Sequence, residues 1–273
     1  ARTIVWGAAL DASRDAEADP ADFIRLVLTH IATETESTTM MTLLRQLVTT
    51  GNLYVNAAER QNALSQIADG LLRLARTAEA GSDAQLQFTK FFALFARSPQ
   101  QVQALHALLS GEETLAGLTI DADLKWELLT GLVVAGAAGH AEIDALVEQD
   151  RTANGEKAAA GARAAIPNAE NKAATWRLLT ETKELSNAHV QSASMAFNRV
   201  IDHYLPTQGL HSVNEDLSFE DALLYTASLL ESASATALDC GEQLASPERA
   251  KILAVWSPRS PASGCSSRST TCM

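Results

Sequence analysis

The stretch Asn56-Ala-Ala-Glu59-Arg-Gln-Asn-Ala-Leu-Ser-Gln-Ile-Ala-Asp-Gly-Leu-Leu-Arg-Leu-Ala75 decides the fold class of this chain. Asn56 and Glu59 stand three residues apart, which is the spacing of a capping box at the start of a helix. The apolar residues that follow recur at helical spacing and share one face: Leu64, Ile67, Leu71, Leu74 and Ala75. A polar cap followed by an apolar stripe predicts an amphipathic α-helix.

Similar helix starts recur along the whole sequence. They are expected at or near Asp19-Pro20, Ser82, Ser98-Pro99, Asp121, Thr152, Asn168, Asn187, Ser218 and Ser246-Pro247. Hydrophobic residues make up 47% of the chain but aromatic residues only 5%, and the alternation typical of strands is nearly absent. We therefore predict an all-α fold of about eleven to thirteen helices. Short polar links favour antiparallel neighbours, which predicts an irregular α-solenoid or superhelix of stacked helix pairs, of the HEAT or armadillo kind.

Charge and composition exclude several classes of partner. The formal net charge is -12, and an acidic surface repels nucleic acid. The longest apolar run, around residues 128–138, is too short to span a bilayer, so no membrane partner is expected. The cysteines Cys240, Cys265 and Cys272 are odd in number and lack the spacing of a metal site. Without a signal peptide, they favour a reducing compartment and a cytoplasmic location.

No catalytic motif is present in the sequence. H-E-x-x-H does not occur, and none of the six histidines has a second histidine four residues away, so no helix face offers two imidazoles to one metal. A nucleophile elbow of the form G-x-S-x-G is also missing. His30 and Glu34 lie four residues apart and could share a metal, but a hydrogen bond on one helix face is favoured. We therefore predict no catalytic residue and no metal ligand in this chain.

Five strings, in a fixed order, give the sequence a family resemblance. They are Val5-Trp6-Gly7 with Asp11 to Glu17, His30 to Thr39 running into Leu43 to Leu47, Gly81 to Phe88, Gly117 to Trp126 with Asp150-Arg151-Thr152, and Ala164 to Pro167 with Lys172 to Trp176. In this order, residues 1 to about 190 resemble the helical C-terminal domain of actinobacterial-type zinc metallopeptidases of the aminopeptidase N family.

The resemblance implies a noncatalytic cap that closes over the active site of a zinc-dependent aminopeptidase and controls the access of peptides. Its partners would then be the catalytic domain of the parent enzyme, which would carry the zinc, and peptide substrates. Glu34, Glu36 and Arg45 are the candidates for lining the substrate cavity, with a solvated helix face as the alternative for each. Trp6, Trp126 and Trp176 are expected to anchor the core.

Three regions are expected along the chain. Residues 1–195 would form the aminopeptidase-like helical domain, and the uncapped start at Ala1 reads as the middle of a longer protein. Residues 196–256 would form a helical appendage, which weakly resembles small uncharacterised helical proteins of pseudomonads. Residues 257–273 are rich in Ser, Pro, Arg, Thr and Cys and are expected to be a disordered tail. The alternative function is a stand-alone helical-repeat scaffold that binds other proteins.

Overall fold

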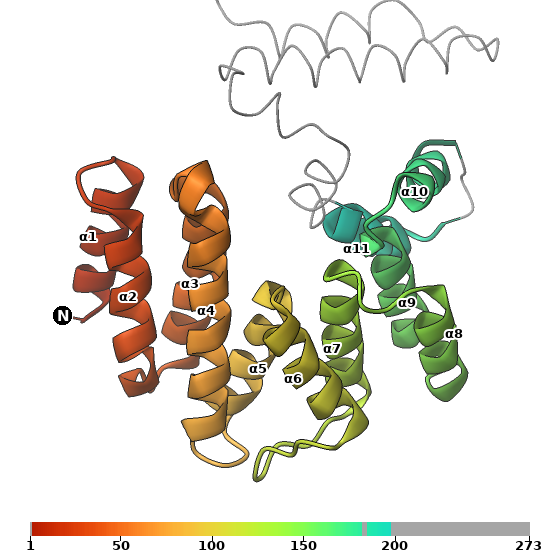
Figure 1. Cartoon of the computed structure of the whole chain (residues 1–273), viewed down its shortest axis with the longest axis horizontal. Helices are drawn as coiled ribbons and strands as arrows, with labels where there is room; N and C mark the ends of the chain where they lie inside the picture. The colour runs from red at the N-terminus through yellow and green to blue at the C-terminus, as the bar shows by residue number, and fades with distance from the viewer. Residues whose placement is uncertain (1, 182–184, 198–273) are drawn as a thin grey trace, which may run out of the picture. The chain divides into compact units, whose positions relative to one another are not determined.

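The computed structural model describes residues 2–181 and 185–197, and this part of the chain is all-α, as predicted (Figure 1). The chain divides into two units, Ala1–Leu210 and His211–Met273, and the described residues belong to the first. Its helices are α1 (Arg2–Arg14), α2 (Pro20–His30), α3 (Ser37–Thr49), α4 (Ala57–Thr77), α5 (Asp83–Phe95), α6 (Pro99–Ser110), α7 (Ala122–Val134), α8 (His140–Gln149), α9 (Ala153–Ala165), α10 (Ala169–Glu181) and α11 (Asn187–Phe197). A 3-10 turn, η1 (Ile31–Thr33), follows α2, and a π-helical turn, η2 (Thr50–Tyr54), follows α3.

Side-chain caps fix the starts of most helices. The predicted caps are confirmed, and each accepts a hydrogen bond from a backbone N–H of the first turn: Asp19, Asn56, Ser82, Ser98, Asp121 and Thr152. The cap of α3 is Glu36, a residue that the sequence suggests for the substrate cavity or for a solvated helix face. Local polar chemistry therefore sets where these helices begin.

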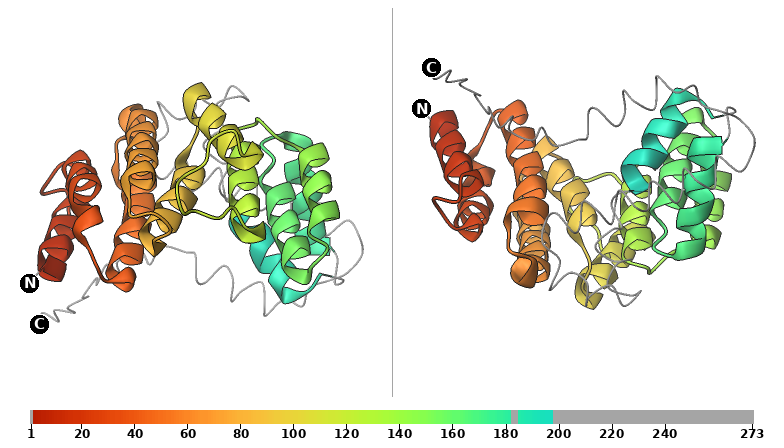
Figure 2. Two further views of the ribbon diagram at one scale, coloured as in Figure 1. Left: turned by 90° about the horizontal axis from the view of Figure 1, so that it is seen from below. Right: turned by 90° about the horizontal axis from the view of Figure 1, so that it is seen from above.

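Helices that are adjacent or next but one in the sequence pack side by side. The closest pairs are α4 with α5, α5 and α6 with α7, α7 with α9, and α9 with α11, and Figure 2 shows this order from two sides. At the crossing of α5 and α7, a Cβ on Gly131 would lie only 2.5 Å from the carbonyl oxygen of Ala93, so glycine permits the close approach. The α-solenoid arrangement itself stays a prediction.

Two hydrophobic cores share one helix. The first core extends from Trp6 on α1 to α7, and the second extends from α7 to α11. Leu124, Leu128 and Leu132 of α7 belong to the first core. On the other side of the same helix, Trp126, Leu129 and Val133 belong to the second. Helix α7 therefore has two buried faces.

Two buried glutamines tie the starts of α5 and α6 to α4. Gln85 and Gln101 are each 2% exposed, and each stands at the third position of its helix. Gln85 accepts a hydrogen bond from the N–H of Gly81 and donates to the carbonyl oxygen of Ala75 on α4. The side chain of Gln101 forms more hydrogen bonds than that of Gln85.

Gln101 is the centre of a hydrogen-bond network. Its Oε1 accepts from the N–H groups of Arg97 and Ser98, at 2.9 and 3.0 Å. Its Nε2 donates to the side chains of Ser65 and Asp69 on α4, at 3.0 and 2.8 Å. One side chain therefore both caps α6 and fastens it to its neighbour.

The prediction for the tryptophans is correct for two of three. Trp6 and Trp126 are 7% and 4% exposed, but Trp176 is 40% exposed. The prediction for Trp176 is wrong because α10 buries none of its side chains, and the indole ring contacts Phe197 with ring centroids 6.3 Å apart.

Predictions for the C-terminal part cannot be compared with the structure. The appendage at 196–256, the tail at 257–273, the three cysteines and the helix starts at Ser218 and Ser246 lie outside the described residues, except for the first two residues of the appendage.

Candidate functional site

The segment after α2 separates His30 from Glu34. Helix α2 ends at His30, Ile31–Thr33 tighten into a 3-10 turn, and Glu34 is extended. A 3-10 turn has three residues per turn instead of 3.6, and the residue after it is extended. Residues four positions apart therefore do not lie on one helix face here. The expectation that these two side chains share one helix face is therefore wrong.

Glu34 joins this segment to α1. Its side chain is only 9% exposed, and its Oε1 accepts a hydrogen bond of 2.9 Å from the indole N–H of Trp6. A buried indole N–H needs such an acceptor, and a charged acceptor makes the stronger bond. Glu34 thus holds α1 to the segment that leads into α3.

Glu36 is the N-cap of α3. Its two carboxylate oxygens accept from the backbone N–H groups of Thr39 and Thr38, at 2.6 and 3.2 Å. Hydrogen bonds from Thr39, then from Thr38, lower the pKa of Glu36 to about 2. The negative charge also complements the positive end of the helix dipole.

Arg45 lies apart from the two acids. It is exposed on α3, nine residues beyond Glu36, which is about 13 Å along the helix axis at the usual rise per residue. No hydrogen bond or ion pair of its guanidinium is found within the described part of the chain. Glu34 and Glu36 already accept hydrogen bonds within the domain, so Arg45 is the candidate whose charged group is left to bind a ligand. That any of the three contacts a peptide stays a prediction.

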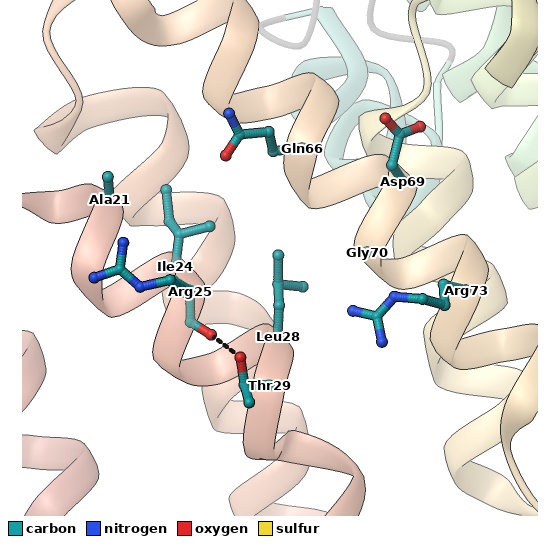
Figure 3. Close-up of a pocket in the computed structure, with 9 residues that line it drawn as sticks. All are labelled: Ala21, Ile24, Arg25, Leu28, Thr29, Gln66, Asp69, Gly70 and Arg73. Atoms are coloured by element: carbon teal, nitrogen blue, oxygen red, sulfur yellow. Dashed lines mark hydrogen bonds between the residues drawn. The ribbon is translucent and has the colours of Figure 1, made fainter.

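A groove between α2 and α4 is a further candidate site (Figure 3). Its volume is about 500 Å³. Three of the lining residues are buried, namely Ile24, Leu28 and Gly70, and the others are exposed: Ala21, Arg25, Thr29, Gln66, Asp69 and Arg73. Glycine at position 70 lets the two helices approach, because a Cβ there would lie 2.8 Å from a methyl group of Leu28.

The charged side chains that line the groove differ in the hydrogen-bond and ion-pair partners that they already have. Arg25 forms an ion pair with Asp22 at 2.5 Å, and Asp69 accepts from Gln101. Arg73 is exposed, extends from α4 toward the space between the helices (Figure 3), and has no side-chain partner within the described residues. It is therefore the group best placed to bind an anion in this groove.

Sequence reasoning missed the groove. Arg25 and Thr29, or Gln66, Asp69 and Arg73, have the helical spacing of an ordinary solvated face. Only the close contact of Leu28 with Gly70, between residues 42 positions apart, brings the two faces together. No pattern of neighbouring residues in the sequence predicts that contact.

Residues 2–181 and 185–197 bring no three His, Cys, Asp or Glu side chains close enough to hold a metal ion. The zinc expected of the parent enzyme does not fit this part of the chain. Among the same residues, no helix combines the length and the apolar composition needed to cross a membrane.

Comparison with known proteins agrees with the resemblance seen in the sequence. Residues 1–205 match the family described as ERAP1-like C-terminal domain. Aminopeptidase N of Streptomyces lividans is 40% identical to this chain over 195 residues. The alignment covers 71% of this chain but 23% of that relative, so the chain spans less than a quarter of the relative's length.

Proposed function

The chain belongs to the family of ERAP1-like C-terminal domains, and on that premise we propose that it is the noncatalytic cap of a zinc-dependent aminopeptidase. The observation that carries the proposal is the 40% identity to Aminopeptidase N over 195 residues. In this proposal the zinc and the catalytic groups belong to another part of the enzyme. The cap closes over the active site and limits which peptides enter.

The groove between α2 and α4 gives the proposal a place where a peptide can bind. An extended peptide carries apolar side chains and at least one carboxylate. Ile24 and Leu28 offer apolar surface, and Arg73 offers a guanidinium that can bind a carboxylate with two hydrogen bonds. Only peptides long enough to extend from the catalytic centre to the cap would use it.

A chimeric enzyme tests this proposal. In Aminopeptidase N of Streptomyces lividans, the matched segment is replaced by the corresponding 195 residues of this chain. Cleavage of a single-residue anilide and of a long peptide is then measured. We expect the chimera to cleave both and to keep the relative's dependence on peptide length, because the proposal gives the two segments the same role. A folded chimera that cleaves the anilide but has lost the relative's dependence on peptide length would contradict the cap function.

Arg73→Ala in the chimera tests the groove. The loss of a hydrogen-bonded charge pair should raise KM for the long peptide about tenfold and leave the anilide nearly unchanged. Arg177→Ala is the matched control, because Arg177 is also exposed and has no side-chain partner within the described residues. Equal effects of the two variants on both substrates would exclude the groove as the peptide contact.

A further inference from the structure

Helix α10 is attached to the domain in a different way from its two neighbours in the sequence. None of its side chains is buried, whereas α9 buries six residues and α11 buries two. Leu179 is the one residue of α10 that packs against the second core, and it is only partly buried. Because burial of apolar surface is the main source of stability, α10 adds little to that core.

Helices α9 and α11 pack directly on each other, although α10 separates them in the sequence. A Cβ on Gly161 of α9 would lie 2.6 Å from the Oγ of Ser192 on α11, so the two helices are in close contact. The same hydroxyl donates a hydrogen bond of 2.9 Å to the carbonyl oxygen of Lys157 on α9. The contact between α9 and α11 therefore does not need α10 between them.

The contacts that hold α10 in place are mostly polar. The Nζ of Lys172 donates to the carbonyl oxygen of Ala164 in the last turn of α9, at 2.7 Å, and to that of Phe197 at the end of α11, at 2.8 Å. It also lies 4.5 Å from the centroid of the Phe197 ring. The side chains of Asn171 and His140, the first residue of α8, are hydrogen-bonded at 2.6 Å. Water can replace such partners at a small net cost, so these contacts hold the helix weakly.

The amine of Lys172 is half-buried without a counter-ion. Its acceptors are neutral, and within the described part of the chain no carboxylate pairs with it. The titratable residues on the helices that pack against α10 are Glu156, Lys157 and Arg163 on α9 and His189 on α11, and α10 itself adds Glu170, Arg177 and Glu181. Burial lowers the pKa of Lys172 to about 8, because the charged form loses water and gains no opposite charge.

Detachment of α10 would return this amine to water, where its pKa is 10.5. The docked helix therefore binds the proton of Lys172 more weakly than the detached helix does. As the pH rises from about 8 toward 10.5, docking becomes more favourable, and below about pH 8 it no longer depends on this group.

We propose that α10 is a strap that detaches from α9 and α11 as one unit, in a minor state of the native protein, while both hydrophobic cores stay folded, and that Lys172 makes this detachment sensitive to pH. An isolated helix of 13 residues is marginal in water, so α10 unfolds when it detaches and its amides become open to exchange. Detachment also uncovers the Phe197 ring, which Trp176 and Lys172 contact in the docked state.

Amide hydrogen exchange of the 273-residue chain at about pH 7 tests the detachment. The amides of α10 should share one protection factor, about 100-fold lower than that of the α9 amides, because α10 opens locally and α9 opens only with the second core. Equal protection in α10 and α9 would overturn the strap. Protection that falls gradually from the middle of α10 to its ends would also overturn it, since that is fraying and not detachment of a unit.

The dependence of this exchange on pH tests the role of Lys172. With millisecond labelling, the protection factor of α10 should rise about tenfold between about pH 7.5 and about pH 9.5, a value reduced from the full effect because the amine is only half-buried. Lys172→Met should remove this rise, because methionine does not titrate. Lys157→Met is the matched control at an exposed lysine of α9 and should keep the rise. A wild type without the rise, or a Lys172→Met variant with the same rise, would overturn the pH sensitivity.

Discussion

Replacing Gln101 by leucine should lower the free energy of unfolding by about 2–4 kcal/mol. Leucine has nearly the same volume, so no cavity forms at this 2% exposed position. The N–H groups of Arg97 and Ser98 lose their shared acceptor. Both residues are only partly buried, so each unsatisfied donor costs about 1–2 kcal/mol, in the lower part of the range for such groups. Ser65 and Asp69 lie closer to the surface and can turn to water, so they add little.

Urea unfolding followed by helical circular dichroism measures this loss. The midpoint should fall while the slope with urea stays constant, since the surface exposed on unfolding is unchanged. Gln103→Leu is the control, because it makes the same change at an exposed position of the same helix. It should alter stability by no more than about 0.5 kcal/mol.

Hydrogen exchange locates the effect. The amides of Arg97 and Ser98 should lose protection in Gln101→Leu, because their acceptor is gone. If Gln101→Leu and Gln103→Leu have the same unfolding free energy, the network does not stabilise the fold and the reasoning is wrong.

The remaining predictions concern two glycines and one cap. Gly131→Ala should destabilise by about 1–3 kcal/mol, because its Cβ would lie 2.5 Å from the carbonyl oxygen of Ala93. Gly7→Ala should stabilise α1 by about 0.5–1 kcal/mol, because the added Cβ would meet no atom within 4 Å. Thermal unfolding measures both variants, and shifts of Tm with the same sign for Gly131→Ala and Gly7→Ala would contradict these two predictions. Hydrogen bonds, foremost from Thr39, lower the pKa of Glu36 from 4.5 to about 2, so its stabilising effect is complete above pH 4.5 and is lost as the pH falls toward 2. The difference in Tm between the wild type and Glu36→Gln should therefore shrink below pH 4.5, and a difference independent of pH would refute this explanation.

The sequence predicted best what depends on neighbouring residues. Ser98 and Asp121 cap helices because a short polar side chain reaches a backbone N–H two or three residues away, and that geometry is visible in the sequence. The apolar stripe of α4 is equally local, and its residues are buried. Glu36 was missed because glutamate is not among the residues that usually cap helices.

Features that depend on distant contacts were not predictable. The partner of Glu34 is Trp6, which is 28 residues away, and nothing in the intervening sequence marks the pair. Trp176 was expected in the core because tryptophan is large and apolar. Its exposure depends on how few neighbours α10 has, which is a property of the assembled domain.

The two buried faces of α7 have a consequence for how the domain melts. Each core contains one buried tryptophan, Trp6 in the first and Trp126 in the second. Variants that keep only one of these two indoles, with Trp176 and Trp256 replaced by phenylalanine, give each core its own fluorescence signal. If α7 separates from either core, the other core loses one of its walls as well. Heating should therefore change both signals at the same temperature, as a single cooperative transition across all the helices from α1 to α11.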